Sequence, residues 1–242
     1  MAAFLDRLRD PRRVLLDGAM GTALLALGLD LSRERAPAWN LRRPGDVLAV
    51  HRAHVAAGAE LVLTNTFVAQ DAPECAAGLA LARESGAALV GGSLFAGLPD
   101  LAERVRALSG ADVLWLETAT SGDEAARAVA VARAATALPI VVTCARISQI
   151  AAPDGVAAAG FNCSPWLPER ARPALPALPV PLVFKPDAAS LAPEEWAALV
   201  DATGARLVGG CCGTTPAHLA ALQRRLARPR PGTSAPPSLP RR

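Results

Sequence analysis

The sequence predicts an α/β protein, a single-domain (β/α)8 barrel of the TIM type. Short apolar runs alternate with helix-like patterns along most of the 242 residues. Runs that are apolar throughout are typical of parallel strands covered on both faces. Eight such runs favour a closed barrel over an open doubly wound sheet. No G-x-G-x-x-G follows the first run, which argues against a dinucleotide-binding fold.

Each expected strand is short, and most are followed by a helix. The strands are expected over residues 14–17, 61–64, 88–91, 113–117, 140–143, 156–161, 182–184 and 207–209. Proline or an acidic residue near a helix start, and glycine just past its end, mark several helices. The helices are expected over residues 20–27, 44–57, 73–85, 101–108, 123–135 and 216–226, and another begins at Pro193.

One crossover departs from this alternation. Too few residues lie between Cys144 and Val156 for a full helix and its turns, so one crossover helix is expected to be reduced or missing. The sixth strand, which follows it, is alanine-rich and therefore weakly marked. The segment from Pro168 to Leu178 is interpreted as helical but broken by proline.

The composition fits a compact protein with one large core. Hydrophobic residues make up 52% of the chain, charged residues 19%, and the net charge is +3. Because the arginines are scattered among carboxylates, and the cluster from Arg224 to Arg230 is interpreted as a helix end and tail, no nucleic-acid contact is expected. The barrel domain is expected to span 1–228, and the Pro/Ser/Arg-rich tail 229–242 to be disordered.

Targeting signals are not evident. No run of about 18 apolar residues is free of charge, glycine and proline, so no membrane span is expected. The charged stretch from Met1 to Arg13 lacks the apolar region of a signal peptide, and a cytoplasmic protein is expected. Five cysteines in a reducing compartment favour metal binding or catalysis over a disulfide framework.

Polar side chains follow the expected strands at the ends that form one mouth of a barrel. The loops at that mouth build the active site of such folds, so these residues are the candidate site. They are Asp17, Asn65, Thr66, Ser93, Glu117, Thr143, Asn162, Cys163, Lys185, Cys211 and Cys212.

Cys163, Cys211 and Cys212 are expected to bind one zinc ion. Zinc favours thiolates, and three protein ligands leave its fourth position open for a substrate thiol, which would lose its proton there. Neighbouring side chains of a straight strand point to opposite faces, but the glycines on either side of the cysteine pair allow a bend. Spacing alone leaves a packing role for these thiols equally open. Cys75 and Cys144 are assigned to packing.

Seven short motifs occur in order along the chain: Asp17–Thr22 (DGAMGT), Ala57–Glu60 (AGAE), Thr64–Phe67 (TNTF), Leu116–Thr118 (LET), Gly160–Pro165 (GFNCSP), Lys185–Ala188 (KPDA) and Gly209–Pro216 (GGCCGTTP). With these motifs the chain resembles the homocysteine S-methyltransferases, including the homocysteine-binding module of methionine synthase. Each motif alone is a weak signal, but the set spans nearly the whole chain before the tail.

The resemblance implies a (β/α)8 barrel enzyme that transfers a methyl group to the sulfur of homocysteine and forms methionine. It implies that Cys163, Cys211 and Cys212 are the ligands of Zn2+, and that the zinc-bound homocysteine thiolate is the nucleophile. The methyl donor would be S-methylmethionine, S-adenosylmethionine, or methyl-cobalamin on a separate protein, since this chain has no room for cobalamin and folate domains.

The resemblance also implies a substrate pocket. Asp17 and Glu117 are implied to hold the homocysteine amino group, and the backbone amides around Gly18, Ala19 and Met20 its carboxylate. Asp17 could instead cap a helix, and Glu117 could instead be a buried ion-pair partner.

Other polar residues have weaker assignments. Asn65 and Thr66 either shape the pocket or close a turn. Lys185 matches the methionine-synthase form of its motif, but Asp187 replaces the asparagine usual there, which leaves the role of Lys185 open. The three histidines, His51, His54 and His218, are assigned to packing, surface or structural roles.

Two segments are short compared with the family, one after Ser93 and one after Cys144. They motivate an alternative function, a catalytically degenerate zinc- or thiol-binding barrel that acts as a partner subunit. Methyl transfer to a thiol other than homocysteine is a further alternative.

Overall fold

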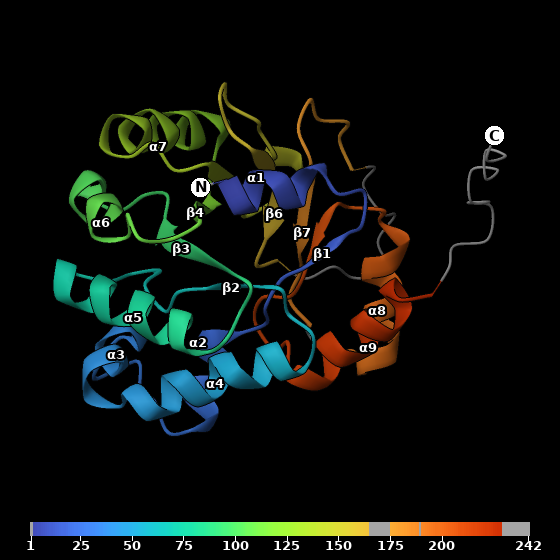
Figure 1. Ribbon diagram of the computed structural model, residues 1–242, viewed down its shortest axis with the longest axis horizontal. Coiled ribbons are helices and arrows are strands. Elements are labelled where there is room, and N and C mark those ends of the chain that lie inside the picture. Colours follow the sequence, from blue (N-terminus) through green and yellow to red (C-terminus); the bar gives the residue numbers. More distant parts are fainter. Residues whose placement is uncertain (1, 165–174, 189, 229–242) are drawn as a thin grey trace, which may run out of the picture.

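The computed structural model describes residues 2–164, 175–188 and 190–228, which form one parallel sheet with helices around it (Figure 1). The eight strands follow the order β1-β8-β7-β6-β5-β4-β3-β2. A parallel bridge between Leu16 and Leu61 brings the two edges together. The sheet therefore curls into a (β/α)8 barrel of the TIM type, and the predicted fold class is confirmed.

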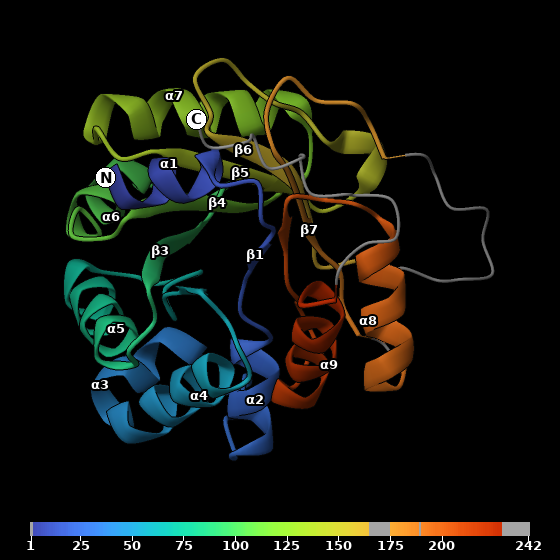
Figure 2. The same cartoon turned by 45° about the vertical axis from the view of Figure 1, so that its right-hand side comes forward.

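All eight strands lie where the apolar runs predict them. They are β1 (Val14–Leu15), β2 (Leu61–Leu63), β3 (Leu89–Phe95), β4 (Val113–Ala119), β5 (Ile140–Cys144), β6 (Ala158–Asn162), β7 (Leu182–Lys185) and β8 (Leu207–Val208). The α-helices are α1 (Ala2–Arg9), α2 (Met20–Ala26), α3 (Trp39–Arg42), α4 (Pro44–Ala56), α5 (Ala72–Glu84), α6 (Leu101–Ala107), α7 (Gly122–Ala135), α8 (Pro193–Ala202) and α9 (Pro216–Leu226). Figure 2 shows α5 and α6 to the left of the strands, α7 above them, and α8 and α9 to the right.

Local capping explains several helix starts. Asp71 and Ser121 each accept a hydrogen bond from the backbone amide three residues ahead, at the starts of α5 and α7. Thr215 and His218 form a capping box at the start of α9. The Nδ1 of His218 accepts from the Thr215 amide at 3.2 Å, which leaves Nε2 to donate to the Leu191 carbonyl at 3.1 Å. These contacts agree with the structural role expected of His218.

The reduced crossover is present. Between β5 and β6 the chain forms only a short 3-10 turn, Ile147–Gln149, as the residue count predicts. The weakly marked sixth strand, β6, is present and buried. Its small residues let β7 approach closely. A Cβ at Gly160 would lie 2.0 Å from the Val183 carbonyl oxygen.

Other expectations differ from the structure. Helices α1 and α3 and the 3-10 turn Ala36–Ala38 are not predicted from the sequence, and strands β3 and β4 extend beyond their predicted ends. Residues 175–178 of the expected proline-broken helix are not helical, and the rest of that helix lies outside the described residues, as does the tail. Among the described helices, none is both long and apolar enough to cross a membrane.

Helix α1 closes the bottom of the barrel. Phe4 is fully buried and packs in one apolar cluster with interior residues of the strands, including Val14, Leu61, Val113 and Leu207. Figure 1 shows α1 lying across the strands at this end. The apolar positions of α1 gain a partner only when the barrel forms, so the helix depends on tertiary packing.

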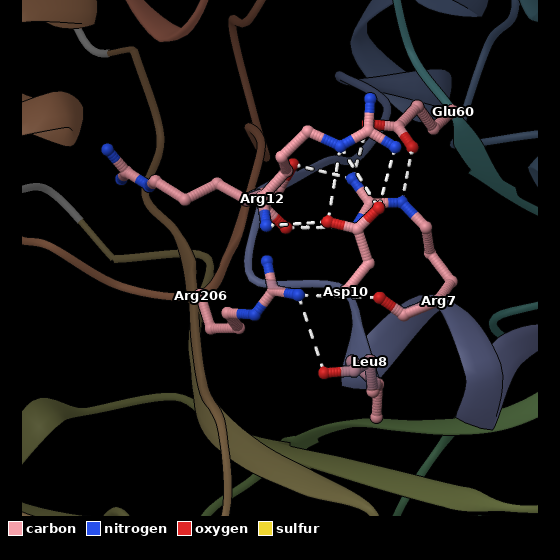
Figure 3. Close-up of polar contacts among 7 residues, drawn as sticks. Arg7, Leu8, Asp10, Arg12, Glu60 and Arg206 are labelled. Atoms are coloured by element: carbon pink, nitrogen blue, oxygen red, sulfur yellow. Dashed lines mark hydrogen bonds and ion pairs between the residues drawn. The ribbon is translucent and has the colours of Figure 1, made fainter. Parts of the chain in front are cut away.

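A cluster of arginine contacts holds α1 in place (Figure 3). Arg7 donates two hydrogen bonds to the Glu60 carboxylate, at 2.7 and 3.0 Å, and two more to the backbone carbonyls of Arg12 and Arg13. Arg206, next to β8, donates to the Arg7 carbonyl at 3.3 Å. The cluster therefore joins α1 to the starts of β1, β2 and β8.

Replacement of Arg7 with methionine should lower the free energy of unfolding by about 1–2 kcal/mol, measured by urea denaturation, because four hydrogen bonds are lost. The Arg7 side chain is only 14% exposed. The matched control is Arg9→Met on the same helix, where a 75% exposed side chain pairs with Asp6 and the loss should stay below about 0.5 kcal/mol. Equal losses in the two variants would contradict the anchoring role of Arg7.

Candidate metal centre and substrate pocket

A cavity of about 220 Å³ opens at the carboxyl-terminal mouth of the barrel. Of the eleven strand-end residues predicted as the site, nine line it. They are Asp17, Asn65, Ser93, Glu117, Asn162, Cys163, Lys185, Cys211 and Cys212. Gly18, Ala19 and Met20 also line the cavity, whereas Thr66 and Thr143 do not.

The three predicted metal ligands come together at this mouth. Cys163 follows β6, and Cys211 and Cys212 follow β8, yet their sulfur atoms all lie within 4.8 Å of one another. The Sγ atoms of Cys163 and Cys212 are 3.5 Å apart, and all three thiols are free. Cys75 and Cys144 are buried elsewhere, as expected of packing residues, and burial raises the pKa of each thiol.

One short segment at the end of β7, Lys185–Ala188, positions all three cysteines through its backbone. The carbonyl of Lys185 accepts from the Cys163 amide at 3.2 Å, and the carbonyl of Pro186 accepts from the Cys211 amide at 2.8 Å. The amide of Ala188 donates to the Cys212 carbonyl at 2.9 Å. Because these bonds use the main chain, the spacing of the thiols depends little on the side chains of this segment.

The local backbone supplies the bends that the cysteine pair needs. Cys163 has a positive φ of 59°, and Gly213 has a φ of 74°. A Cβ at Gly210 would lie 2.2 Å from the side chain of Thr214, so only glycine fits there. The Gly210 amide donates to the Asp17 carbonyl at 3.0 Å, which ties the β8 loop to the end of β1.

This donor set fits a tetrahedral thiophilic metal ion. Thiolates bound to zinc at about 2.3 Å are separated by about 3.8 Å, which matches the observed cluster. Hydrogen bonds from Cys163 and Cys211 lower the pKa of Cys212 to about 3, while Cys163 and Cys212 raise the pKa of Cys211. The three sulfurs lie close enough for one cation to replace their protons.

Asp17 lies at the end of β1 and is buried. Its Oδ2 accepts from the Leu63 amide at 2.7 Å, and its Oδ1 accepts from the Lys185 ammonium at 2.7 Å. Asp17 does not cap α2. The N-cap residue of this helix is Ala19, and no side chain makes a capping hydrogen bond there. The burial of Lys185 acts to lower its pKa, but Asp17 and Glu117 raise the net pKa above its usual value. Sequence reasoning did not identify this ion pair.

Glu117 lies in β4 and faces the same cavity. Its Oε1 accepts from the Ser93 hydroxyl, and its Oε2 accepts from the Asn162 side-chain amide at 3.2 Å. Burial raises the pKa of Glu117, and the nearby Lys185 charge opposes that shift. Asn162 also accepts from the Thr118 amide at 3.1 Å, so the β6 residue before Cys163 orients this carboxylate.

Asn65 and Thr66 have different positions, since Asn65 faces the cavity and Thr66 does not. The side-chain amide of Asn65 donates to the Ala36 carbonyl and to Asn40, and this residue lines the cavity. Thr66 donates its hydroxyl to the Ser93 carbonyl at 2.6 Å and is fully buried, which is a structural contact. Sequence reasoning did not assign other cavity-lining residues to the site, namely Gly21, Thr22, Ala36, Pro37, Phe67, Val68 and Thr118.

His51 and His54 lie on α4 behind the pocket and are 0% and 1% exposed. Neither ring nitrogen of His51 has a hydrogen-bond partner within the described part of the chain. Burial lowers the pKa of His51 from 6.5 to about 4, opposed by Asp17 and reinforced by His54. Both histidines are therefore core residues, as the sequence favours.

The lowered pKa of His51 makes stability depend on pH. Between pH 6.5 and about 4 the unfolded chain binds a proton that the folded chain excludes, so stability falls as pH falls through this window. At about pH 4, the acid end of this window, the lowered pKa of His51 should reduce the free energy of unfolding by roughly 3 kcal/mol, measured by urea unfolding at each pH. A His51→Gln variant should show a shallower decline, and parallel profiles for the two proteins would contradict the prediction.

Comparison with known proteins identifies the family of this chain. The sequence model of the family described as homocysteine S-methyltransferase matches residues 14–92 and 100–226. Its gap coincides with the short segment after Ser93. No curated protein matches the chain.

Two solved structures of a bacterial enzyme are similar to the chain. The metallated form of the homocysteine methyltransferase MmuM from Escherichia coli is 25% identical, with a TM-score of 0.69 over 90% of this chain and 98% of that one. The oxidized form is also 25% identical, with a TM-score of 0.71 and coverages of 91% and 99%. A geranylgeranylglyceryl phosphate synthase from Thermoplasma acidophilum, 12% identical with a TM-score of 0.52, shares the fold alone. Since the family model covers most of the chain, the protein belongs to the homocysteine S-methyltransferase family of enzymes.

Proposed function

We propose that this protein is a zinc-dependent methyltransferase that moves a methyl group to the sulfur of homocysteine and forms methionine. The observation that supports this proposal most directly is the cluster of three free thiols at the edge of a cavity that Asp17 and Glu117 line. Family membership supports the reaction, and the MmuM structure in metallated form supports a metal in this cluster.

Cys163, Cys211 and Cys212 would hold the zinc ion. When bound, zinc supplies a Lewis acid that favours the thiolate form of the substrate sulfur at neutral pH. The backbone of Lys185–Ala188 keeps the three ligands in place, so little reorganisation accompanies metal binding.

The cavity would bind the amino-acid end of homocysteine. Acidic side chains at its wall, Asp17 and Glu117, complement an ammonium group. Backbone amides of Gly18 and Met20, where α2 begins without a side-chain cap, complement the carboxylate, whereas the Ala19 amide donates to the Thr214 carbonyl at 3.2 Å. The homocysteine thiol would release its proton to solvent on binding, and its sulfur would then form a bond to the methyl carbon as the bond between that carbon and the donor breaks.

The methyl donor would be S-methylmethionine, S-adenosylmethionine, or methyl-cobalamin carried by a separate protein. Purified protein should contain one zinc per chain, measured by mass spectrometry, and should form methionine from homocysteine with one of these donors. Protein that is carefully reduced and still binds no zinc would refute the proposal. Full zinc occupancy without methionine from any of the three donors would favour a catalytically degenerate barrel instead.

A further inference from the structure

Arg104 is a buried arginine of α6 whose side chain donates only to backbone carbonyls. Its Nε and Nη2 donate to the carbonyls of Ala69 and Gln70, at 2.7 and 2.6 Å. Its Nη1 donates to the carbonyls of Pro99 and Asp100, at 3.0 and 3.1 Å. The residue is only 9% exposed, and a buried charge is costly unless hydrogen bonds replace its hydration. The planar guanidinium suits several acceptors at once, so Arg104 joins two separate segments of the chain.

The two segments that Arg104 joins are loops at the mouth of the barrel. Residues 64–71 connect β2 to α5, and Phe67 and Val68 of this loop line the cavity. Residues 96–100 connect β3 to α6, where the family model has its gap. Arg104 therefore ties the shortened segment after β3 to one wall of the pocket.

The loop after β2 is held from outside along much of its length. The Phe67 carbonyl accepts from the Phe95 amide at 2.8 Å, and the two rings lie 5.5 Å apart. The Val68 carbonyl accepts from Arg35 at 3.0 Å. Arg104 holds the next two carbonyls. The loop has no regular secondary structure of its own, so its conformation depends on these external donors.

This loop faces the cysteine cluster across the mouth. In a closed barrel of eight strands β2 lies opposite β6, and Cys163 follows β6. Phe67, Val68 and Cys163 line the same cavity. The position of the loop therefore sets the width of the pocket on the side where a metal-bound thiol would lie.

We infer that Arg104 is a positioning residue, which holds the wall formed by Phe67 and Val68 at a fixed distance from the cysteine cluster. The identity of the bound thiol rests on the proposed function, whereas the support of the wall does not. A wall that is already ordered reduces the entropy lost when a ligand binds against it. Arg104 thus raises the affinity for homocysteine without contacting it.

Amide hydrogen exchange tests the support of the wall without any substrate. In Arg104→Met the amides of Ala69 and Gln70 should exchange about tenfold faster than in the wild type, because their loop loses two hydrogen bonds. The matched control is Arg106→Met at an exposed position of the same helix, which should leave these rates unchanged. Equal rates at Ala69 and Gln70 in Arg104→Met and the wild type would overturn the inference.

The binding of two thiols to the zinc-loaded protein, measured by calorimetry, tests the effect on the pocket. Homocysteine reaches the walls of the pocket, whereas mercaptoethanol offers the metal a thiol without an amino-acid group. The ratio of the two affinities therefore measures the pocket and not the metal. Arg104→Met should lower this ratio by about fivefold or more. Arg104→Lys keeps the charge and some of the bonds, and should lower it less.

Zinc content is the control for folding, because the backbone bonds that hold the cysteines do not involve Arg104. An Arg104→Met protein that retains one zinc per chain and the wild-type affinity ratio would overturn the inference. If Arg104→Met retains no zinc, Arg104→Lys decides the question by the same criterion. Wild-type protein that binds zinc but neither thiol would instead refute the proposed function, and hydrogen exchange would then decide the role of Arg104.

Discussion

Replacement of Cys211 with serine should remove the bound metal and slow methyl transfer to homocysteine by about a thousandfold or more, equivalent to about 4 kcal/mol of barrier. Serine retains the backbone amide that donates to the Pro186 carbonyl, so the loop itself is preserved. What the variant loses is one of three sulfurs within 4.8 Å of one another. A hydroxyl is a poor ligand for zinc at neutral pH, and two thiolates leave the ion weakly bound.

The control for this variant is Cys75→Ala, which removes a fully buried thiol of α5 that lies outside the cluster. That protein should retain one zinc per chain and its activity, although the cavity left behind should lower its stability by about 1 kcal/mol. Zinc per chain is measured by mass spectrometry, and activity by the methionine formed. Retention of zinc and full activity in Cys211→Ser would show that the cluster is not the metal site.

Replacement of Gly160 with alanine should lower the free energy of unfolding by about 3 kcal/mol or more. The added Cβ would lie 2.0 Å from the Val183 carbonyl oxygen and 2.7 Å from its carbonyl carbon. These are backbone atoms of the neighbouring strand β7, and β6 and β7 are paired through Gly160 and Val183. Neither strand can move aside without breaking this pairing, so the clash cannot be relieved by a side-chain rotation.

Urea denaturation of Gly160→Ala and of a matched glycine variant would test this. Gly45 lies in the first turn of α4, and a Cβ there would meet no atom within 4 Å. Gly45→Ala should therefore leave stability unchanged or raise it by up to about 1 kcal/mol, through better helix propensity and a less flexible unfolded chain. Similar unfolding midpoints for Gly160→Ala and the wild type would mean that β6 and β7 are less closely packed than described.

The barrel and its cluster of three cysteines were predictable for the same physical reason. Buried parallel strands read as apolar runs, and the first polar residue after each run lies at the mouth. That rule places Cys163 and Cys211 at the ends of different strands of one barrel. Counting residues also predicted the reduced β5–β6 crossover, because a helix with its turns needs more chain than that segment has.

The contacts within the site were not predictable in this way. Strand ends give the members of the site but not their distances, which depend on the stagger of neighbouring strands. The pairing of Lys185 with Asp17 and the hydrogen bond of Asn162 to Glu117 are consequences of that stagger. Helix α1 was missed because its partners lie at the bottom of the barrel, so its own eight residues carry little of the signal.

The join between β1 and β2 has a consequence for local opening of the native barrel. Strand β1 has two residues, and the two strands meet through a single bridge at Leu16, with one further bond from the Glu60 amide. Asp17 spans this seam, because it belongs to the β1 end while its carboxylate accepts from the Leu63 amide of β2. Amide hydrogen exchange should therefore be fastest among the strands at this seam. A substrate that binds against Asp17 would then slow hydrogen exchange at the Leu63 amide. Slower exchange at this amide would show that a ligand at the mouth stabilises the contact between β1 and β2.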